Sequence, residues 1–179
     1  EYLDIEVHST RSSEEALKAL NEAMAEGVQV LEYKELPGET KNAMSSVAAA
    51  DYTVVFKDKE KNPFTLLELS EALKGFYQGQ DAILITKQTK KSERVIDLKP
   101  LIYVFRPYVE KELGWQGFFL QLSAGSTDNI KPELVLQDFY QYFGKKYQPF
   151  NMQIHRVETY EHTEEGLRPL YQAGDVIEA

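Results

Sequence analysis

From residue 52 onward, segments with the hydrophobic period of a strand alternate with segments that have the period of a helix, and this order limits the available folds. The order is strand, helix, strand, an irregular hairpin region, strand, helix, strand. The predicted strands cover residues 52–57, 82–87, 94–98, 101–106, 118–122 and 152–160. The βαββαβ order is typical of a ferredoxin-like α+β sandwich.

Two helices are expected within this unit. Asn62 is predicted to cap the first helix, with Pro63 at its first position, where a missing N–H costs nothing. Its predicted buried face consists of Leu66, Leu69, Leu73 and Phe76. Pro132 opens the second helix, whose buried stripe is predicted to contain Leu136, Phe139, Tyr140 and Phe143. Gly79 and Gly144 are placed to end the two helices.

The first 50 residues have a shorter pattern. Residues 2–7 alternate apolar and polar side chains, which predicts a half-buried strand. Ser12 and Glu15 form a capping box before a helix, Gly27 is placed to end it, and 28–33 is predicted as a second strand. Residues 41–50 are predicted as a short helix with Met44, Val47 and Ala48 turned inward.

These patterns predict a partial ferredoxin-like βαβ unit plus a linker helix at 1–50, followed by the complete ferredoxin-like unit at 51–179. A lone βαβ piece presents an unfinished sheet. We therefore expect an N-terminal segment before Glu1 that completes the first unit; packing of the piece onto the second unit is the alternative.

Composition excludes several kinds of chemistry. The chain has no cysteine, which rules out a disulfide, a thiolate nucleophile and a cysteine-ligated zinc or iron–sulfur centre of its own. A cytoplasmic location is expected, since small secreted proteins more often use disulfides. The apolar runs are too short to span a bilayer, so we expect no membrane partner.

The net charge of −9 disfavours binding to a phosphate backbone. The one dense basic stretch, 87–94, is predicted to be the solvated tip of a hairpin, with a nucleic-acid contact as the alternative. Arg106, Tyr108 and Trp115 are predicted to be mainly core, or alternatively an exposed protein-binding patch.

No motif for catalysis or for a cofactor is present, and we predict no cofactor and no metal site. His155 is separated from the next histidine by seven positions, which matches no metal-ligand spacing. The small-residue loop around Gly125 and Ser126 runs into the helix at Pro132. It is predicted to be a capping turn, with an anion site at the helix N-terminus as the alternative.

Five stretches in order resemble a known family: 1–6 (EYLDIE), 49–52 (AADY), 96–102 (IDLKPLI), 124–133 (AGS, then NIKPE) and 154–156 (IHR). Together they are similar to the radical-SAM-linked family, a conserved domain of unknown function, whose members normally carry a further N-terminal segment. The resemblance implies a radical SAM protein as partner. Because the chain has no cysteine for a cluster, it implies a non-catalytic accessory role, as a substrate-presenting or scaffold domain.

Polar positions inside the family-like motifs are the candidate binding residues. They are Asp97, Lys99, Gly125, Ser126, Asn129, Lys131, His155 and Arg156. Turns, caps and strand-pairing groups are the structural alternative for them. An RNA-binding ferredoxin-like module is the alternative function, and an independent enzyme that uses Asp97, Lys99, His155 or Arg156 is a third hypothesis.

Overall fold

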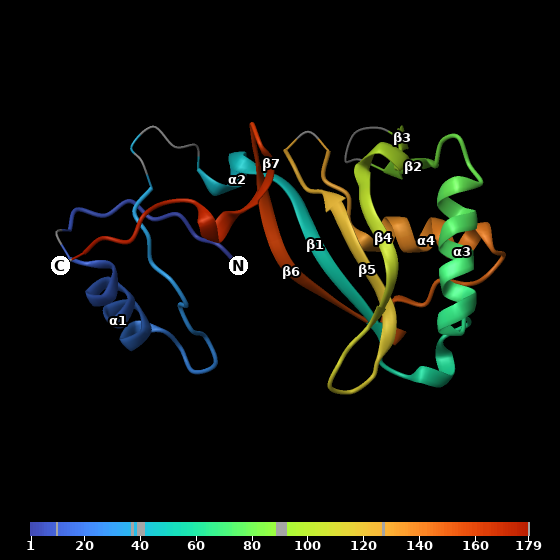
Figure 1. The fold of residues 1–179 in the computed structure, drawn as a ribbon, viewed down its shortest axis with the longest axis horizontal. Helices are drawn as coiled ribbons and strands as arrows, with labels where there is room; N and C mark the ends of the chain where they lie inside the picture. The colour runs from blue at the N-terminus through green and yellow to red at the C-terminus, as the bar shows by residue number, and fades with distance from the viewer. Residues whose placement is uncertain (10, 37, 39–41, 89–92, 127, 179) are drawn as a thin grey trace. The chain divides into compact units, whose positions relative to one another are not determined.

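A computed structural model (Figure 1) describes residues 1–9, 11–36, 38, 42–88, 93–126 and 128–178. The chain is a mixed α+β protein with a main antiparallel sheet. It divides into two compact units, Glu1–Ser46 with Tyr160–Ala179, and Val47–Thr159. The predicted division into 1–50 and 51–179 stays a prediction. No helix in the described ranges is long and apolar enough to cross a membrane.

The main sheet has the strand order β4-β5-β1-β6-β7. Its strands are β1 (Val47–Phe56), β4 (Ile102–Val109), β5 (Gln116–Ser123), β6 (Met152–Thr163) and β7 (Gly166–Pro169). β5 pairs antiparallel with both β1 and β4. β7 pairs antiparallel with the last residues of β6.

Helices α3 (Leu66–Gln78) and α4 (Pro132–Tyr142) share one hydrophobic cluster with β1 and β5. In α4 the predicted stripe is confirmed, because Leu136, Phe139 and Tyr140 are buried. Phe139 lies at the centre of the cluster. The centre of its ring lies 5.3–5.7 Å from the centres of six other aromatic rings, those of Phe64, Phe76, Phe105, Phe118, Tyr140 and Phe143.

Between α3 and β4, strands β2 (Leu84–Gln88) and β3 (Glu93–Asp97) form a separate two-stranded antiparallel sheet. This confirms the predicted hairpin. Residues 89–92, half of the basic stretch at 87–94, lie outside the described residues.

Two predicted helix boundaries are wrong. The capping box that starts α3 is made by Thr65 and Glu68. Asn62 instead accepts a hydrogen bond from the Phe64 N–H at 3.0 Å in the turn before it. The predicted helix at 41–50 is reduced to α2 (Ala43–Ser46), and Val47 already begins β1.

In the first unit the predicted capping box of α1 (Ser13–Ala23) is confirmed. The Glu15 N–H donates to Ser12 Oγ at 3.3 Å, and the Ser12 N–H donates back to Glu15 Oε2 at 3.1 Å. The helix ends earlier than predicted, at Ala23, although Gly27 does adopt a positive φ of 85°.

The strands predicted at 2–7 and 28–33 are not formed. A half-buried strand needs a neighbouring ladder, and Leu3 (85% exposed) and Leu31 (77% exposed) have their side chains largely in solvent. Instead, residues near 35 meet the C-terminal segment. Glu35 and Asp175 form an isolated bridge, with both N–H···O distances at 2.9 Å.

Candidate functional site

The candidate residues Asp97 and Lys99 hold the end of the β2–β3 sheet beside α3. Asp97 Oδ1 accepts hydrogen bonds from the N–H groups of Ile83 (2.9 Å) and Lys99 (3.0 Å). Lys99 Nζ donates to the Gln80 carbonyl and lies 5.3 Å from the centre of the Tyr77 ring. The Tyr77 hydroxyl donates to the Lys99 carbonyl at 3.3 Å. These contacts fit the structural alternative.

Gly125 and Ser126 lie in the bend that follows β5. Ala124 and Asn129 form a bridge across the bend, and the Ile130 N–H donates to the Ser123 carbonyl at 2.9 Å. Ser123 Oγ also donates to the Asp128 carbonyl, at 2.7 Å. The loop is therefore a closed turn, as expected for a connection of small residues.

Lys131 is the N-cap of α4, but its side chain makes no capping hydrogen bond and is exposed. Pro132 follows at the first turn and has no N–H to offer. The end of the helix therefore has one backbone N–H fewer to donate to an anion. This does not support the alternative of an anion site at the α4 N-terminus.

His155 and Arg156 are consecutive, exposed residues on β6. Met152 and Ile154 of the same strand pack on the helix side. Because side chains alternate along a strand, Arg156 lies on the same side of the sheet as Met152 and Ile154, and His155 lies on the opposite side. The eight candidates thus fall in three separate stretches of the chain, 97–99, 125–131 and 155–156, and their role in binding stays a prediction.

The sheet side opposite α3 and α4 carries a set of paired polar and aromatic residues, here called the outer face. It comprises Asp51, Thr53, Arg106, Phe119, Gln121 and His155. Gln121 Nε2 donates to Asp51 Oδ1 at 2.9 Å. The Arg106 guanidinium carbon lies 4.2 Å from the centre of the Phe119 ring, and the two residues are paired across β4 and β5.

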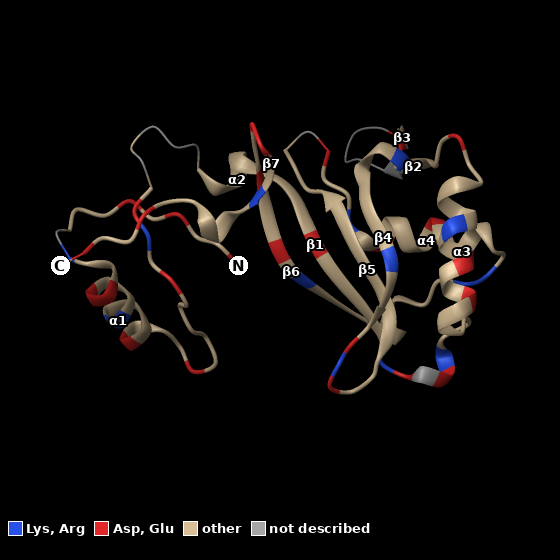
Figure 2. Ribbon diagram, viewed as in Figure 1, with Lys and Arg blue, Asp and Glu red and all other residues tan. Residues whose placement is uncertain are grey.

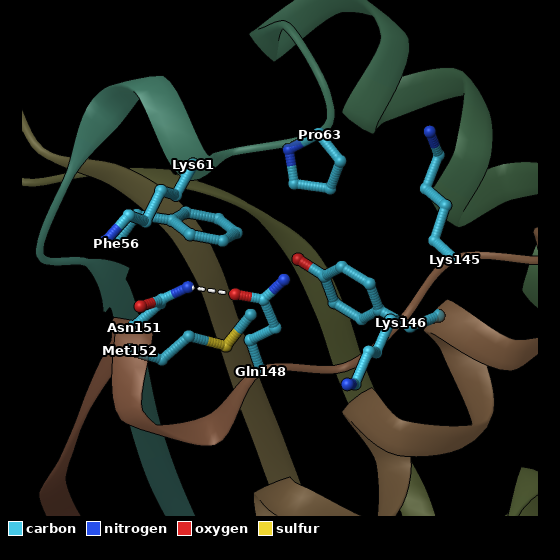
Figure 3. Close-up of a pocket in the computed structure, with 9 residues that line it drawn as sticks. Phe56, Lys61, Pro63, Lys145, Lys146, Gln148, Asn151 and Met152 are labelled. Atoms are coloured by element: carbon cyan, nitrogen blue, oxygen red, sulfur yellow. Dashed lines mark hydrogen bonds between the residues drawn. The ribbon is translucent and has the colours of Figure 1, made fainter.

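A pocket of about 230 Å³ opens between the end of β1, the short helix η1 (Lys59–Lys61), the end of α4 and η3 (Pro149–Asn151). It is lined by Phe56, Lys61, Pro63, Tyr140, Lys145, Lys146, Gln148, Asn151 and Met152. Figure 3 shows the Gln148 amide extending into the pocket, where it accepts a hydrogen bond from Asn151. The ammonium groups of Lys145 and Lys146 extend in opposite directions from neighbouring residues (Figure 3).

Tyr140 is the pocket residue with the most unusual environment. Its side chain is 1% exposed, and its hydroxyl has no hydrogen-bond partner in the described part of the chain. Burial raises the pKa of this phenol far above its ordinary value, and the neighbouring Tyr147 adds to the effect. The Tyr140 hydroxyl is therefore protonated at neutral pH.

Metal binding has no obvious place in the described ranges, where no three His, Asp or Glu side chains gather closely enough to hold an ion.

Comparison with known proteins gives one result. A family model described as "Uncharacterized protein conserved in bacteria (DUF2344)" matches residues 1–132. The chain belongs to this family. Neither a curated protein nor a solved structure matches it. The DUF2344 match includes six of the candidates, from Asp97 to Lys131, and ends at the start of α4, before His155 and Arg156.

Sequence reasoning missed two parts of this DUF2344 protein. The Asp51–Gln121 hydrogen bond joins residues 70 positions apart, so no local pattern indicates it. The pocket was also missed, because Tyr140 has the same helical spacing as an ordinary core residue. The run Lys145–Lys146 after Gly144 is the one local signal that a basic pocket is nearby.

Proposed function

We propose that this DUF2344 protein is an accessory partner of a radical SAM enzyme, acting as a substrate-presenting or scaffold domain without catalysis of its own, in the cytoplasm. The link to radical SAM chemistry comes from the resemblance of the five ordered motifs. The absence of cysteine from the chain supports a non-catalytic role. A radical SAM cluster is held by cysteine thiolates, which another chain must provide.

We further propose that Val47–Thr159 is a ferredoxin-like sandwich. Two features support this: the element order β1, α3, β4, β5, α4, β6, and the spatial strand order β4-β5-β1-β6 with helices in one cluster. Such a sandwich leaves one sheet side for contacts. The observation that carries the proposed role is on that side, where exposed Arg106 stacks on half-buried Phe119. Arg and aromatic residues are frequent anchors of protein interfaces.

The proposal is tested by co-purification with a radical SAM enzyme from the same organism. We expect the tagged enzyme to retain the wild-type chain, and Arg106→Glu to weaken the complex by about tenfold or more, as for an interface anchor. Lys74→Glu is the matched control, since Lys74 is an exposed cation on α3 that pairs with Glu71 at 3.1 Å. A wild-type chain that neither binds the enzyme nor changes its turnover contradicts the proposal.

RNA binding is the second candidate function, favoured by the same Arg106–Phe119 stack, because bases stack on aromatic and guanidinium planes. The net charge of −9 opposes it. Figure 2 shows basic positions on separate elements, such as α3 and β4, with acidic positions next to the basic one on α3. In a filter-binding assay with single-stranded RNA, this function predicts affinity that falls as salt rises and a further loss of about tenfold in Phe119→Ala. Absence of binding at low salt rejects it.

A further inference from the structure

Three buried polar atoms lack a partner in the described part of the chain, and one of them, the Tyr140 hydroxyl, belongs to a residue that lines the pocket at the end of α4. They are Asn62 Nδ2, Tyr140 Oη and Tyr147 Oη. The two tyrosine rings are 5.9 Å apart, and Asn62 precedes Pro63, a lining residue. Folded proteins contain few such groups, because a buried donor left without a hydrogen bond destabilises the fold. The Tyr140 hydroxyl in the wall of this pocket therefore indicates a missing acceptor.

All of these groups are suited to donate a hydrogen bond. The Asn62 amide nitrogen carries only donors, and each phenol carries an O–H. Burial raises the pKa of both phenols, that of Tyr147 to about 12, with a smaller contribution from Glu133. The hydroxyls therefore keep their protons at neutral pH and can donate them to an oxygen.

The charge around the pocket has the sign that an anion needs. Three lysines and no acidic residue line it, in a chain with a net charge of −9. Two of the lysines already interact with other residues. Lys61 Nζ lies 3.7 Å from Asp58 Oδ2, and Lys145 Nζ lies 4.8 Å from the centre of the Phe64 ring. Lys146 makes no ion pair with a described residue, which leaves its charge for a ligand.

Apolar side chains form part of the remaining wall, with Gln148 and Asn151 beside them. Phe56, Pro63 and Met152 line the pocket beside the polar groups. Its volume of about 230 Å³ is below the range of about 300–1,000 Å³ that is usual for drug-sized ligands. The occupant is therefore small, with one anionic group and a short apolar body.

We propose that this pocket binds a small carboxylate or phosphate compound, whose anionic oxygen accepts a hydrogen bond from Tyr140 and is attracted by Lys146. The Tyr140 hydroxyl is buried, and Tyr140 lines the pocket. Gln148, an exposed residue whose amide extends into the pocket (Figure 3), is the side chain that must rotate to admit the ligand. This site does not depend on the radical SAM partner.

The test is a titration of the full chain, followed by NMR chemical shifts, with inorganic phosphate and with benzoate at constant ionic strength. We expect at least one probe to bind in a saturable way below about 10 mM, and the tighter one identifies the anionic group. Tyr140→Phe keeps the ring and removes the hydroxyl. It is expected to weaken binding about tenfold without lowering the melting temperature, because the lost hydroxyl had no partner in the fold.

Two further variants separate a built site from general attraction of anions. Lys146→Gln is expected to weaken binding severalfold, whereas Lys74→Gln, the same charge change on α3, is expected to leave it unchanged. The proposal is overturned if neither probe saturates, if Tyr140→Phe binds as well as wild type, or if Lys74→Gln loses as much affinity as Lys146→Gln. A clear fall in the melting temperature of Tyr140→Phe also contradicts it, since water would then already satisfy the hydroxyl.

Discussion

Replacing Phe139 with alanine is expected to lower the free energy of unfolding by about 3–5 kcal/mol, the usual cost of deleting a buried phenylalanine ring. Phe139 is fully buried, and six aromatic rings surround it. Tilted and edge-to-face ring pairs add to the hydrophobic contribution of the buried area. Because α3, α4 and the sheet all contribute rings, no single element can collapse into the space left behind. The loss should therefore fall in the upper part of this range.

Urea denaturation followed by circular dichroism measures this loss. Phe150→Ala is the matched control, because it deletes the same ring at a position that is 91% exposed. The control should change the free energy of unfolding by less than about 0.5 kcal/mol. Since the whole stability of a domain this size is about 5–15 kcal/mol, Phe139→Leu is a milder second variant if Phe139→Ala does not fold. Equal losses at the two positions would show that the aromatic cluster is not the core.

Periodicity predicted the second unit well where the apolar pattern was strong. The stripe that contains Leu136, Phe139 and Tyr140 has the spacing of a helix with one buried face, and α4 buries that face. The capping box of Ser12 and Glu15 was readable for a similar reason, since both partners are three residues apart. Structural features that depend on residues close together in the chain can therefore be predicted from the sequence.

The start of β1 shows where local propensity fails. Alanine is the best helix former, so an alanine-rich segment favours a helix in isolation. In the structure Ala49 pairs with Ser123 and Ala50 with Leu122, and both alanines are buried. A ladder with a strand more than 70 residues away overrides a preference of a few tenths of a kcal/mol per residue.

The first unit shows the opposite failure. Residues 2–7 have the alternation of a strand, yet Leu3 is 85% exposed and no ladder forms there. Alternating apolar and polar residues indicate which side chains would share a face of a strand. The strand itself forms only if a neighbouring strand can pair with its backbone. The pocket was missed for a comparable reason. Whether the Tyr140 hydroxyl has a partner depends on segments around Lys61 and Gln148, which no pattern around Tyr140 describes.

Replacing Gly117 with alanine is expected to destabilise the second unit by about 3 kcal/mol or more, at or above the upper end of ordinary overpacking. An alanine Cβ at this position would lie 1.8 Å from the Val54 carbonyl oxygen and 2.9 Å from Val55 Cα. Both are backbone atoms of the neighbouring strand, which cannot rotate away as a side chain can. A glycine in a strand interior often marks such a close approach of another backbone.

The matched control is Gly75→Ala on α3, where nothing lies within 4 Å of the added Cβ. Alanine is favoured over glycine inside a helix, so this variant should gain up to about 1 kcal/mol. Urea denaturation should show that the free energy of unfolding falls in Gly117→Ala and rises in Gly75→Ala, and a Gly117→Ala protein as stable as wild type contradicts the prediction.

The substitution at Gly117 should also affect the outer face. Gly117 pairs with Val55 on one side and Tyr108 on the other, so a displaced β5 would also shift the adjacent Phe119 from beneath Arg106. If the proposed complex with a radical SAM enzyme forms through the outer face, a folded Gly117→Ala variant should therefore bind that enzyme more weakly as well, whereas Gly75→Ala should bind it normally.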